Sequence, residues 1–274
     1  IRTRNSNGET ADMTAAREME ASDLIWKHWQ NGTVIADLPP GLKPASRGEG
    51  YAIQACMARF SARPIAGWKI AATSVAGQTH IGVDGPLAGR LLQEFVHGNG
   101  AALSLATNRM RVAEPEFAFR FAEPLKPRVE PYSVGEVMVA VATLHLAIEV
   151  PDSRFADFAA VGGPTLIADA ACASQLVVGD AVAADWRSLD LSQHAVTGRV
   201  AGRYTRDGSG GNVLGDPRIA LAWLVNELSS LEITVGEGEL VTTGTSVPPL
   251  EIEPGDRVDA DFGVLGGVCV SFEA

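Results

Sequence analysis

The sequence predicts an α+β protein in which an N-terminal helical layer precedes a β-rich core. Two helical patterns occupy the first 66 residues, and short apolar segments separated by glycine and proline dominate the remainder. Strand and helix patterns do not alternate as in a βαβ fold, and no G-x-G-x-x-G motif follows a predicted strand, which disfavours a dinucleotide-binding fold. We therefore expect a polar tail (1–12), a helical segment (13–66) and a β-rich domain (67–274).

The helical layer follows a polar tail that lacks any hydrophobic period. Its first helix is predicted to begin near Thr14, which can cap it, and to end at Asn31. One broad face of this helix carries the apolar residues Met19, Ile25, Trp26 and Trp29. Ser46 and Glu49 have the spacing of a capping box and predict a second helix that ends before Pro64.

The β-rich part contains most of the predicted strands. They cover residues 67–73, 102–105, 111–121 and 144–150, and a short helix with a glycine-broken loop separates the first two. Ser133 and Glu136 have capping-box spacing and start a helix before the fourth strand. Residues 164–176 are predicted to be helical, and their small side chains suit close packing against a sheet.

The final third of the chain combines one helix with short strands. Alternating residues that turn at Asp207-Gly208 predict a β-hairpin. Asp216 as the N-cap and Pro217 as the first helical residue start the most strongly patterned helix, 216–231. Proline and glycine turns divide the segment that follows into short strands.

Charge and cysteine content exclude several classes of function. The 33 acidic and 22 basic residues give a net charge of −11, which argues against binding to nucleic acid or to an anionic membrane surface. The three cysteines, Cys56, Cys172 and Cys269, lie far apart, so a zinc site or a disulfide framework is not expected. No apolar run reaches the length of a membrane span, and no signal-peptide pattern opens the chain. These features predict a cytoplasmic protein without nucleic-acid or membrane partners.

The most informative local motif is Glu114-Pro115-Glu116. In a strand, residues two apart point to the same face, so the two carboxylates would lie side by side. Like charges that close repel unless a cation lies between them or one is protonated. Pro115 has no N–H, so its strand is expected to lie at a sheet edge or to contain a bulge. Glu149 closes a strongly apolar strand and is a third candidate, because there it needs solvent or a partner.

Glu114, Glu116 and Glu149, without cysteine or clustered histidine, predict a site for a hard divalent cation, Mg²⁺ or Mn²⁺. The spacing alone leaves an alternative open, because a Glu-x-Glu pair on the solvent face of an edge strand is common. The five histidines of the chain show no ligand spacing. Cys172 is more typical of a small buried packing residue than of a nucleophile.

These residues also carry a resemblance to a known family. From about Gly50 to Phe272 the chain resembles the fumarylacetoacetate hydrolase family, within it the 2-keto-4-pentenoate hydratase branch, which also contains 4-oxalocrotonate decarboxylases. The matching segments are 50–54 (GYAIQ), 67–74 (GWKIAATS), 81–89 (IGVDGPLAG), 113–119 (AEPEFAF), 147–155 (AIEVPDSRF) and 215–228 (GDPRIALAWLVNEL), together with LVTTGT and GDRVDADFGVLGGVCVSF near the end. Each segment is weak alone, but their order and spacing are specific.

The resemblance implies a mixed-sheet β-roll core with helices around it, in the catalytic domain 67–274. It implies a divalent cation, Mg²⁺ or Mn²⁺, held by Glu114, Glu116 and Glu149, and a small 2-oxo or dienoic acid as substrate. A 2-oxo acid can chelate the cation, which then stabilises the enolate formed at the adjacent carbon. The implied activity is that of a lyase, a hydratase that adds water to a 2-hydroxy-alka-2,4-dienoate in the degradation of aromatic compounds.

Two alternatives to the hydratase remain. The first is the sister decarboxylase of a 2-oxo-3-enedioate, which would pass through a similar enolate. The second is a non-catalytic member that kept the fold, against which the intact set of three glutamates argues. The resemblance also implies a homo-oligomer, and we expect the glycine-rich apolar C-terminal strands and the tryptophans to leave more apolar surface than one subunit buries.

By position in the family's motifs, Lys69 and Asp84 are the candidate catalytic residues, and Arg154 and Thr245 the candidate substrate-binding residues. Lys69 would shuttle a proton near the metal; from the residues alone, a lysine that snorkels from its strand to solvent is the alternative. Asp84 is equally compatible with an ordinary turn before Gly-Pro. Arg154 either binds an acidic substrate or ties down the metal loop through Asp152.

One segment departs from the family's pattern. The branch usually carries Asp-Asn-Ala-Ser-Ser-Gly where this chain reads Asp-Ala-Ala-Cys-Ala-Ser, residues 169–174. An amide and two hydroxyls are lost or moved near the expected site, which leaves the substrate, and the choice between hydratase and decarboxylase, open. Hydrolases of the family activate water with a His–Glu pair on a lid, and no motif here matches it, which argues against C–C hydrolysis.

Overall fold

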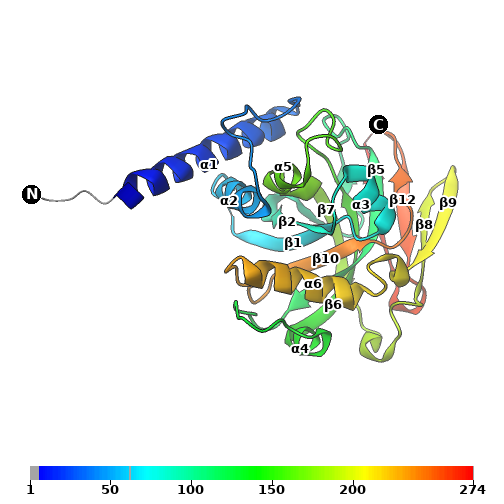
Figure 1. Cartoon of the computed structure of the whole chain (residues 1–274). Coiled ribbons are helices and arrows are strands. Elements are labelled where there is room, and N and C mark those ends of the chain that lie inside the picture. Colours follow the sequence, from blue (N-terminus) through cyan, green and yellow to red (C-terminus); the bar gives the residue numbers. More distant parts are fainter. Residues whose placement is uncertain (1–5, 62, 274) are drawn as a thin grey trace, which may run out of the picture.

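The structure is a computed structural model that describes residues 6–61 and 63–273, and it contains two curled β-sheets with helices around them (Figure 1). The eight-stranded mixed sheet has the order β2-β1-β10-β5-β6-β7-β3, and β11 pairs with β5 beyond the end of β10. Its strands are β1 (Ile65–Ala71), β2 (Leu87–Leu92), β3 (Val96–Gly98), β5 (Val112–Phe121), β6 (Val141–Val150), β7 (Gln175–Ala181), β10 (Leu240–Thr245) and β11 (Leu250–Glu251). The predicted α+β class is confirmed.

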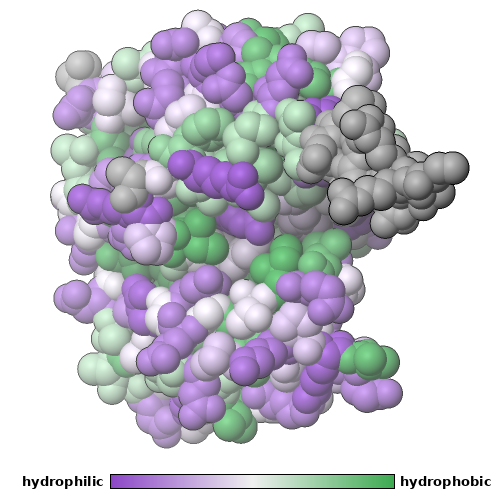
Figure 2. All heavy atoms as spheres, turned by 90° about the vertical axis from the view of Figure 1, so that its left-hand side faces the viewer, coloured by the Kyte–Doolittle hydropathy of each residue, from purple (hydrophilic) through white to green (hydrophobic). Residues whose placement is uncertain are grey.

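The second sheet is five-stranded, with the order β4-β13-β12-β8-β9. Its strands are β4 (Ala102–Leu103), β8 (Ala195–Val200), β9 (Tyr204–Ser209), β12 (Arg257–Asp261) and β13 (Gly267–Phe272). The helices are α1 (Ser6–Asn31), α2 (Arg47–Met57), α3 (Val75–Ile81), α4 (Val134–Ala140), α5 (Gly163–Ala168) and α6 (Pro217–Ser230). Figure 2 shows one face of the molecule, on which hydrophobic residues lie in small groups among hydrophilic ones.

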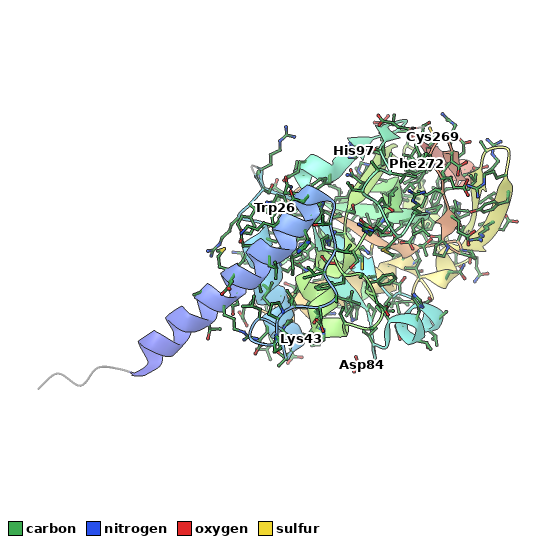
Figure 3. All side chains as sticks on the ribbon, turned by 90° about the horizontal axis from the view of Figure 1, so that it is seen from above. Trp26, Lys43, Asp84, His97, Cys269 and Phe272 are labelled. Carbon is green, nitrogen blue, oxygen red and sulfur yellow. The ribbon has the colours of Figure 1, made fainter. Side chains whose placement is uncertain are left out.

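The first helix is longer than predicted. α1 begins at Ser6, so residues 6–12, expected in a polar tail, are helical, whereas residues 1–5 lie outside the described residues. A polar segment without an apolar period can extend a helix that its neighbours have nucleated, because each added residue gains a hydrogen bond without a new nucleation cost. α1 ends at Asn31, as predicted, and projects from the body (Figures 1 and 3). Where it meets the body, Trp26 stacks on Phe60 and Trp29 on Phe95.

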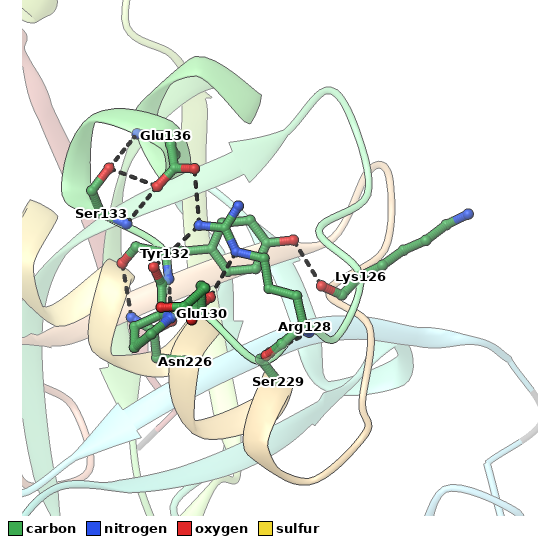
Figure 4. A network of polar contacts seen from close by, with 9 residues as sticks. Lys126, Arg128, Glu130, Tyr132, Ser133, Glu136, Asn226 and Ser229 are labelled. Carbon is green, nitrogen blue, oxygen red and sulfur yellow. Dashed lines mark hydrogen bonds and ion pairs between the residues drawn. The ribbon is translucent and has the colours of Figure 1, made fainter.

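Capping explains where the next helices begin. Ser46 Oγ accepts a hydrogen bond from Glu49 N at the start of α2, but the Glu49 carboxylate accepts from Ala45 N, so only half of the predicted capping box forms. At α4 the box is complete, since Ser133 Oγ accepts from Glu136 N and the Glu136 carboxylate accepts from Ser133 N (Figure 4).

α6 begins at Pro217 after the N-cap Asp216, as predicted. The helix runs alongside β10, and its side chains also fix the loop that precedes α4 (Figures 1 and 4). Asn226 exchanges two hydrogen bonds with the backbone of Tyr132, and Ser229 bonds the backbone of Arg128. These contacts fasten the loop that precedes α4 to α6.

The two faces of β5 have opposite roles. Its odd-numbered aromatic residues face the core, where Phe117 lies edge-on to Phe262, with ring centroids 5.1 Å apart. The even-numbered residues, Glu114, Glu116 and Ala118, face the other side. β6 follows the same alternation, because it pairs antiparallel with β5 in register. One face of the larger sheet is therefore left for the polar site.

Pro115 does not lie in an edge strand, because β5 runs between β10 and β6 in the middle of the sheet. The expected bulge is not in the strand of Pro115 either: the register shift lies in β10, between Thr242 and Thr245, which pair with Ala118 and Glu116 of β5. Pro115 O accepts a hydrogen bond from Ser246 N at 2.8 Å. Since the N and C=O of one strand residue point the same way, the missing N–H faces this irregular junction between β10 and β11.

Two local predictions are wrong. The β8–β9 hairpin turns at 201–203, with Gly202 at φ 74°, and Gly208 lies inside β9 opposite Val196. Gly208 is needed for close approach, since a Cβ there would lie 2.1 Å from Ser246 O. The helix predicted over 164–176 ends at Ala168 in α5 and is followed by a left-handed turn.

Gly67 in β1 offers a test of the close packing of the larger sheet. Its φ is 147°, and an added Cβ would lie 1.9 Å from Leu240 O and 2.5 Å from Leu240 N. We expect Gly67→Ala to lower the free energy of unfolding by at least about 2 kcal/mol, because backbone must move. In the control Gly135→Ala, in α4, the new methyl would meet nothing within 4 Å beyond its chain neighbours and the backbone of its own helix, and stability should be unchanged or rise by up to about 1 kcal/mol. Urea unfolding of both variants is the measurement, and equal stability of the two would contradict this packing.

Candidate functional site

The three predicted glutamates meet on one face of the larger sheet. Glu114 and Glu116 lie two residues apart on β5, and Glu149 on β6 is the direct antiparallel partner of Glu114. Paired residues of neighbouring strands point to the same face. One carboxylate oxygen from each lies within 4.8 Å of the others. The expected convergence of the three side chains is thus present in the structure.

The carboxylates are buried and incompletely hydrogen-bonded. Glu116 and Glu149 are fully buried, and Glu114 is half-buried. Glu116 Oε2 accepts a hydrogen bond from Gly244 N at 2.9 Å. Among the described residues, neither Glu116 Oε1 nor Glu149 Oε2 has a hydrogen-bond partner, and Glu149 Oε1 has only the ion pair with Lys69 Nζ at 3.1 Å. Buried charge without partners is costly, and a cation bound by these oxygens would remove that cost, so the site fits a hard divalent metal.

Proton affinity in the cluster follows from the same crowding. Burial, together with repulsion from Glu149, raises the pKa of Glu114 to about 7. Burial and repulsion from both other glutamates raise the pKa of Glu116, and burial raises that of Glu149 against the opposing effect of Lys69. Near neutral pH a cation would therefore have to displace protons from these carboxyl groups.

Lys69 lies within reach of the cluster. It comes from β1, and its side chain is only 3% exposed, so the snorkelling alternative is wrong. Its Nζ donates to Ala171 O at 3.0 Å and lies 3.1 Å from Glu149 Oε1. Burial alone would lower the pKa of Lys69, but the nearby carboxylates, chiefly Glu149, more than offset it and hold the pKa above its usual range. The ammonium is therefore fixed beside the cluster.

The segment that supplies the Ala171 carbonyl is a left-handed turn. Ala170, Ala171 and Cys172 have φ values of 51°, 49° and 64°, and each such non-glycine residue costs roughly 1–3 kcal/mol. Gly89 on β2 makes room for this turn, because a Cβ there would lie 1.9 Å from Ala170 O. Alanine and cysteine carry no sequence signal for left-handed backbone, so the sequence does not predict this turn.

Arg154 does not face the glutamates but contacts Asp169 and Ala173, the residues on either side of this turn. Its guanidinium pairs with the buried Asp169 carboxylate through Nε, and it donates to Ala173 O at 2.9 Å. Its face covers the ring of Trp29, 4.0 Å from the centroid. Arg154 lines a separate cavity of about 240 Å³, so a direct substrate contact is not supported. It does tie down a loop, but through Asp169 and not through Asp152 as expected.

A cavity of about 470 Å³ opens beside the glutamates. Lys69, Glu114, Cys172 and Thr245 line it. The Thr245 hydroxyl donates to Val247 O at 2.7 Å, so its proton is already engaged. The other residues that line the cavity are mostly apolar. For those that lie in strands, the alternation of apolar and polar residues along the strand is the sequence signal that could have identified them.

Asp84, like Arg154, is a predicted site residue that the structure does not bring to the glutamates. It is exposed on the loop between α3 and β2 and lies at the outer edge of the molecule (Figure 3). It is absent from the described lining of the cavity beside the glutamates. The alternative for this residue, an exposed turn aspartate before Gly-Pro, agrees with that position.

Comparison with known proteins shows that the chain is similar to hydratases along almost its whole length. No family model matches it. The chain is 30% identical over 265 residues to a 2-keto-4-pentenoate hydratase of Paraburkholderia xenovorans, covering 96% of this chain and 97% of the relative. It is 30% identical over 254 residues to a 2-hydroxyhexa-2,4-dienoate hydratase of Comamonas testosteroni, covering 90% of this chain and 94% of that protein.

Decarboxylases are also similar to this chain. A 4-oxalocrotonate decarboxylase of Pseudomonas putida is 28% identical over 210 residues, 76% of this chain and 77% of the relative. The fold matches that of 4-oxalocrotonate decarboxylase from Pseudomonas putida G7, solved with magnesium and adipate, with a TM-score of 0.84, 23% identity and coverage of 99% of this chain and 100% of that one. Together with the 30% identity to a hydratase over almost the full length of both chains, this shows that the chain belongs to the hydratase and decarboxylase branch of the fumarylacetoacetate hydrolase family.

Proposed function

We propose that this protein is a divalent-metal-dependent lyase, a hydratase that adds water to a 2-hydroxy-alka-2,4-dienoate during the degradation of aromatic compounds. The observation that carries the proposal is the meeting of three carboxylates, two of them fully buried with unpartnered oxygens, beside a buried lysine. The hydratase names of the relatives that match along almost the whole chain support it. The non-catalytic alternative is disfavoured, because an unused cluster of buried carboxylates would only destabilise the fold.

Decarboxylation of a 2-oxo-3-enedioate is the second candidate, and the similarity to 4-oxalocrotonate decarboxylases favours it. The two reactions are separated by their products. Hydration removes the dienoate absorbance in the ultraviolet without gas release, whereas decarboxylation releases CO₂ from the dicarboxylic acid. We expect the purified protein with Mg²⁺ to consume dienoate, and CO₂ release from the dicarboxylic acid in its place would establish the second candidate.

In the proposed mechanism, Glu114, Glu116 and Glu149 would hold Mg²⁺ or Mn²⁺. When bound, such a cation would act as a Lewis acid toward the carboxylate and 2-oxo oxygens of the substrate. Gly244 N fixes the Glu116 carboxylate through its hydrogen bond. Lys69 lines the cavity and holds a proton at Nζ, which can be exchanged with the substrate.

The remaining predicted residues take smaller parts. Thr245 lines the cavity with its hydroxyl proton already donated, so toward water it offers an acceptor oxygen, and we assign it no bond to a substrate carboxylate. Arg154 positions the 170–172 turn through Asp169. We assign Asp84 no catalytic part, because it is exposed outside the cavity.

Location and assembly remain predictions. Within residues 6–61 and 63–273, none of the helices combines the length and apolar character of a membrane span. The proposed site requires neither nucleic acid nor a membrane, and the cytoplasm is the expected compartment.

A test of the metal site is Glu116→Gln, which keeps the side-chain shape and removes the charge. We expect Mn²⁺ binding to weaken at least about 100-fold, because a ligand is lost. In wild type, binding should be weaker at pH 6 than at pH 8, since the carboxyl groups with raised pKa must lose protons to bind a cation. Isothermal titration calorimetry at both pH values is the measurement.

The matched control for this variant is Glu251→Gln, on the neighbouring strand β11, where the carboxylate is exposed. Its Mn²⁺ affinity should equal that of wild type. Without metal at pH 8, Glu116→Gln should melt no lower than wild type, because it removes a buried carboxyl group whose charged form is disfavoured. Unchanged Mn²⁺ affinity in a folded Glu116→Gln variant would refute the metal site.

Lys69→Met tests the proton-shuttle role. Methionine keeps an apolar stem and removes the ammonium, so folding should survive and metal affinity should not fall. Turnover at saturating metal and substrate should drop by roughly 10²–10⁴-fold, the range typical of lost acid–base catalysis. Lys126→Met, which alters an exposed lysine, is the control and should leave turnover unchanged. Wild-type turnover in a folded Lys69→Met variant would remove Lys69 from the mechanism.

We also expect at least a dimer, on the basis of the family resemblance. The surface argument for it is not supported, because the exposed large apolar residues among those described, Val75, Val129, Val139, Ile219 and Val264, lie on separate elements. Light scattering at micromolar concentration gives the mass directly, and a monomer would refute the expectation.

A further inference from the structure

The cavity beside the glutamates is charged at its inner end, where Lys69 and Glu114 lie, and most of its remaining lining is apolar, with Thr73, Ser74 and His80 among the exceptions. β1 and β5 run in opposite directions, since β1 is parallel to β10 and β10 is antiparallel to β5. Lys69 pairs with Thr242 of β10, which in turn pairs with Ala118 of β5. Lys69 is therefore aligned with Ala118, which follows Glu116 by two residues toward the buried end of β5. Moving outward, β5 presents Glu116, Glu114 and then Val112 on the same face. A substrate whose acidic head lies at the glutamates must therefore extend its far end along the outer wall.

That outer wall is built from apolar side chains of several elements. Ile81 ends α3, Leu87 begins β2 and Leu166 lies in α5, while Met110 and Phe158 belong to loops. All of them line the cavity together with Val112. Such a wall offers dispersion contacts and the hydrophobic effect to an apolar group, and no hydrogen bond from its side chains to a polar one.

Positive charge is scarce along the same path. Among the described lining residues, none is an arginine, and the groups that can carry positive charge are Lys69 and His80. The Lys69 ammonium is engaged by Glu149 and Ala171 O at the inner end. His80 is exposed at the rim, and its ring lies edge-on to Phe158, 5.8 Å between centroids. A second carboxylate at the far end of a substrate would lose water there without gaining a buried counter-charge.

The cavity is also larger than a five-carbon acid requires. Its volume is about 470 Å³. A five-carbon hydroxydienoate has eight non-hydrogen atoms, which at roughly 30 Å³ each, the share of a water molecule in the liquid, fill about half of that space. The cavity therefore has room for a longer substrate.

From these observations we propose that the preferred substrate carries an uncharged apolar group larger than a methyl at its far end, and that the site discriminates against a second carboxylate there. Met110, Phe158 and the residues around them are the specificity determinants. The proposal rests on the proposed function, because it takes the glutamates as the place where the acidic head binds.

Binding of unreactive 2-oxo acids tests this without turnover. The probes are 2-oxopentanoate, 2-oxoheptanoate and 2-oxoheptanedioate, the last two of equal chain length and different far ends. With wild-type protein at saturating Mn²⁺, calorimetry should show 2-oxoheptanoate binding tightest, at least about tenfold tighter than 2-oxoheptanedioate. 2-Oxopentanoate should bind more weakly than 2-oxoheptanoate.

Variants of Met110 locate the effect in the outer wall. Met110→Arg places a cation there and should narrow or invert the preference for 2-oxoheptanoate over 2-oxoheptanedioate. Met110→Gln, of similar length and without charge, is the matched control and should not improve binding of 2-oxoheptanedioate. A preference that Met110→Arg leaves unchanged would overturn the assignment of the tail to this wall.

The outcomes separate the two proposals. Tight binding of 2-oxoheptanedioate by wild type, equal to or better than that of 2-oxoheptanoate, overturns this inference while the metal-dependent activity stands. If wild type binds 2-oxoheptanedioate tightly and His80→Gln does not, His80 supplies the counter-charge, and the inference is overturned in that case too. If the folded protein with Mn²⁺ binds none of the three acids, the proposed function and the inference both fail.

Discussion

Mutual repulsion among three carboxylates on one buried face of a sheet is the constraint on which the rest of this structure depends. Glu114, Glu116 and Glu149 are brought together by the antiparallel register of β5 and β6, so the fold cannot separate them. Their charge is balanced in part by Lys69 and by one backbone N–H, and their unpartnered oxygens leave the remainder to a proton or a cation. Without a proton or a cation, these carboxylates would destabilise the fold, so the cluster is best explained by a bound cation.

Several unusual features of the backbone are arranged around this cluster. Pro115 separates the two glutamates of β5 and faces the point where β10 gives way to β11. Gly244 lies within the register shift of β10, and its N–H bonds the Glu116 carboxylate. On the other side, the left-handed turn at 170–172 aims the Ala171 carbonyl at Lys69. Its conformational strain is held by the Arg154–Asp169 ion pair and by the absence of a side chain at Gly89. The strained backbone therefore lies next to the site, where it fixes the direction of the Lys69 ammonium group.

How far the sequence predicted this site can be seen residue by residue. The period of two placed Glu114 and Glu116 on one face. The apolar strand that Glu149 closes made it the third candidate, which the resemblance supported, but only the register of β5 and β6 brings Glu149 opposite Glu114. The resemblance also marked residues 169–174 as unusual. Their left-handed conformation carries no local signal, because contacts with Lys69, Arg154 and Gly89 impose it. Long-range pairings of this kind decided the outcome for Arg154 as well, which finds Asp169 instead of a substrate.

The central claim is that these three glutamates bind a divalent cation. It is tested most directly by anomalous X-ray diffraction from crystals of the wild-type protein grown with Mn²⁺. A single strong anomalous peak should lie between the carboxylates of Glu114, Glu116 and Glu149, at distances of about 2.0–2.2 Å from one oxygen of each. A manganese peak elsewhere in the molecule, with the three carboxylates free of it, would contradict the account.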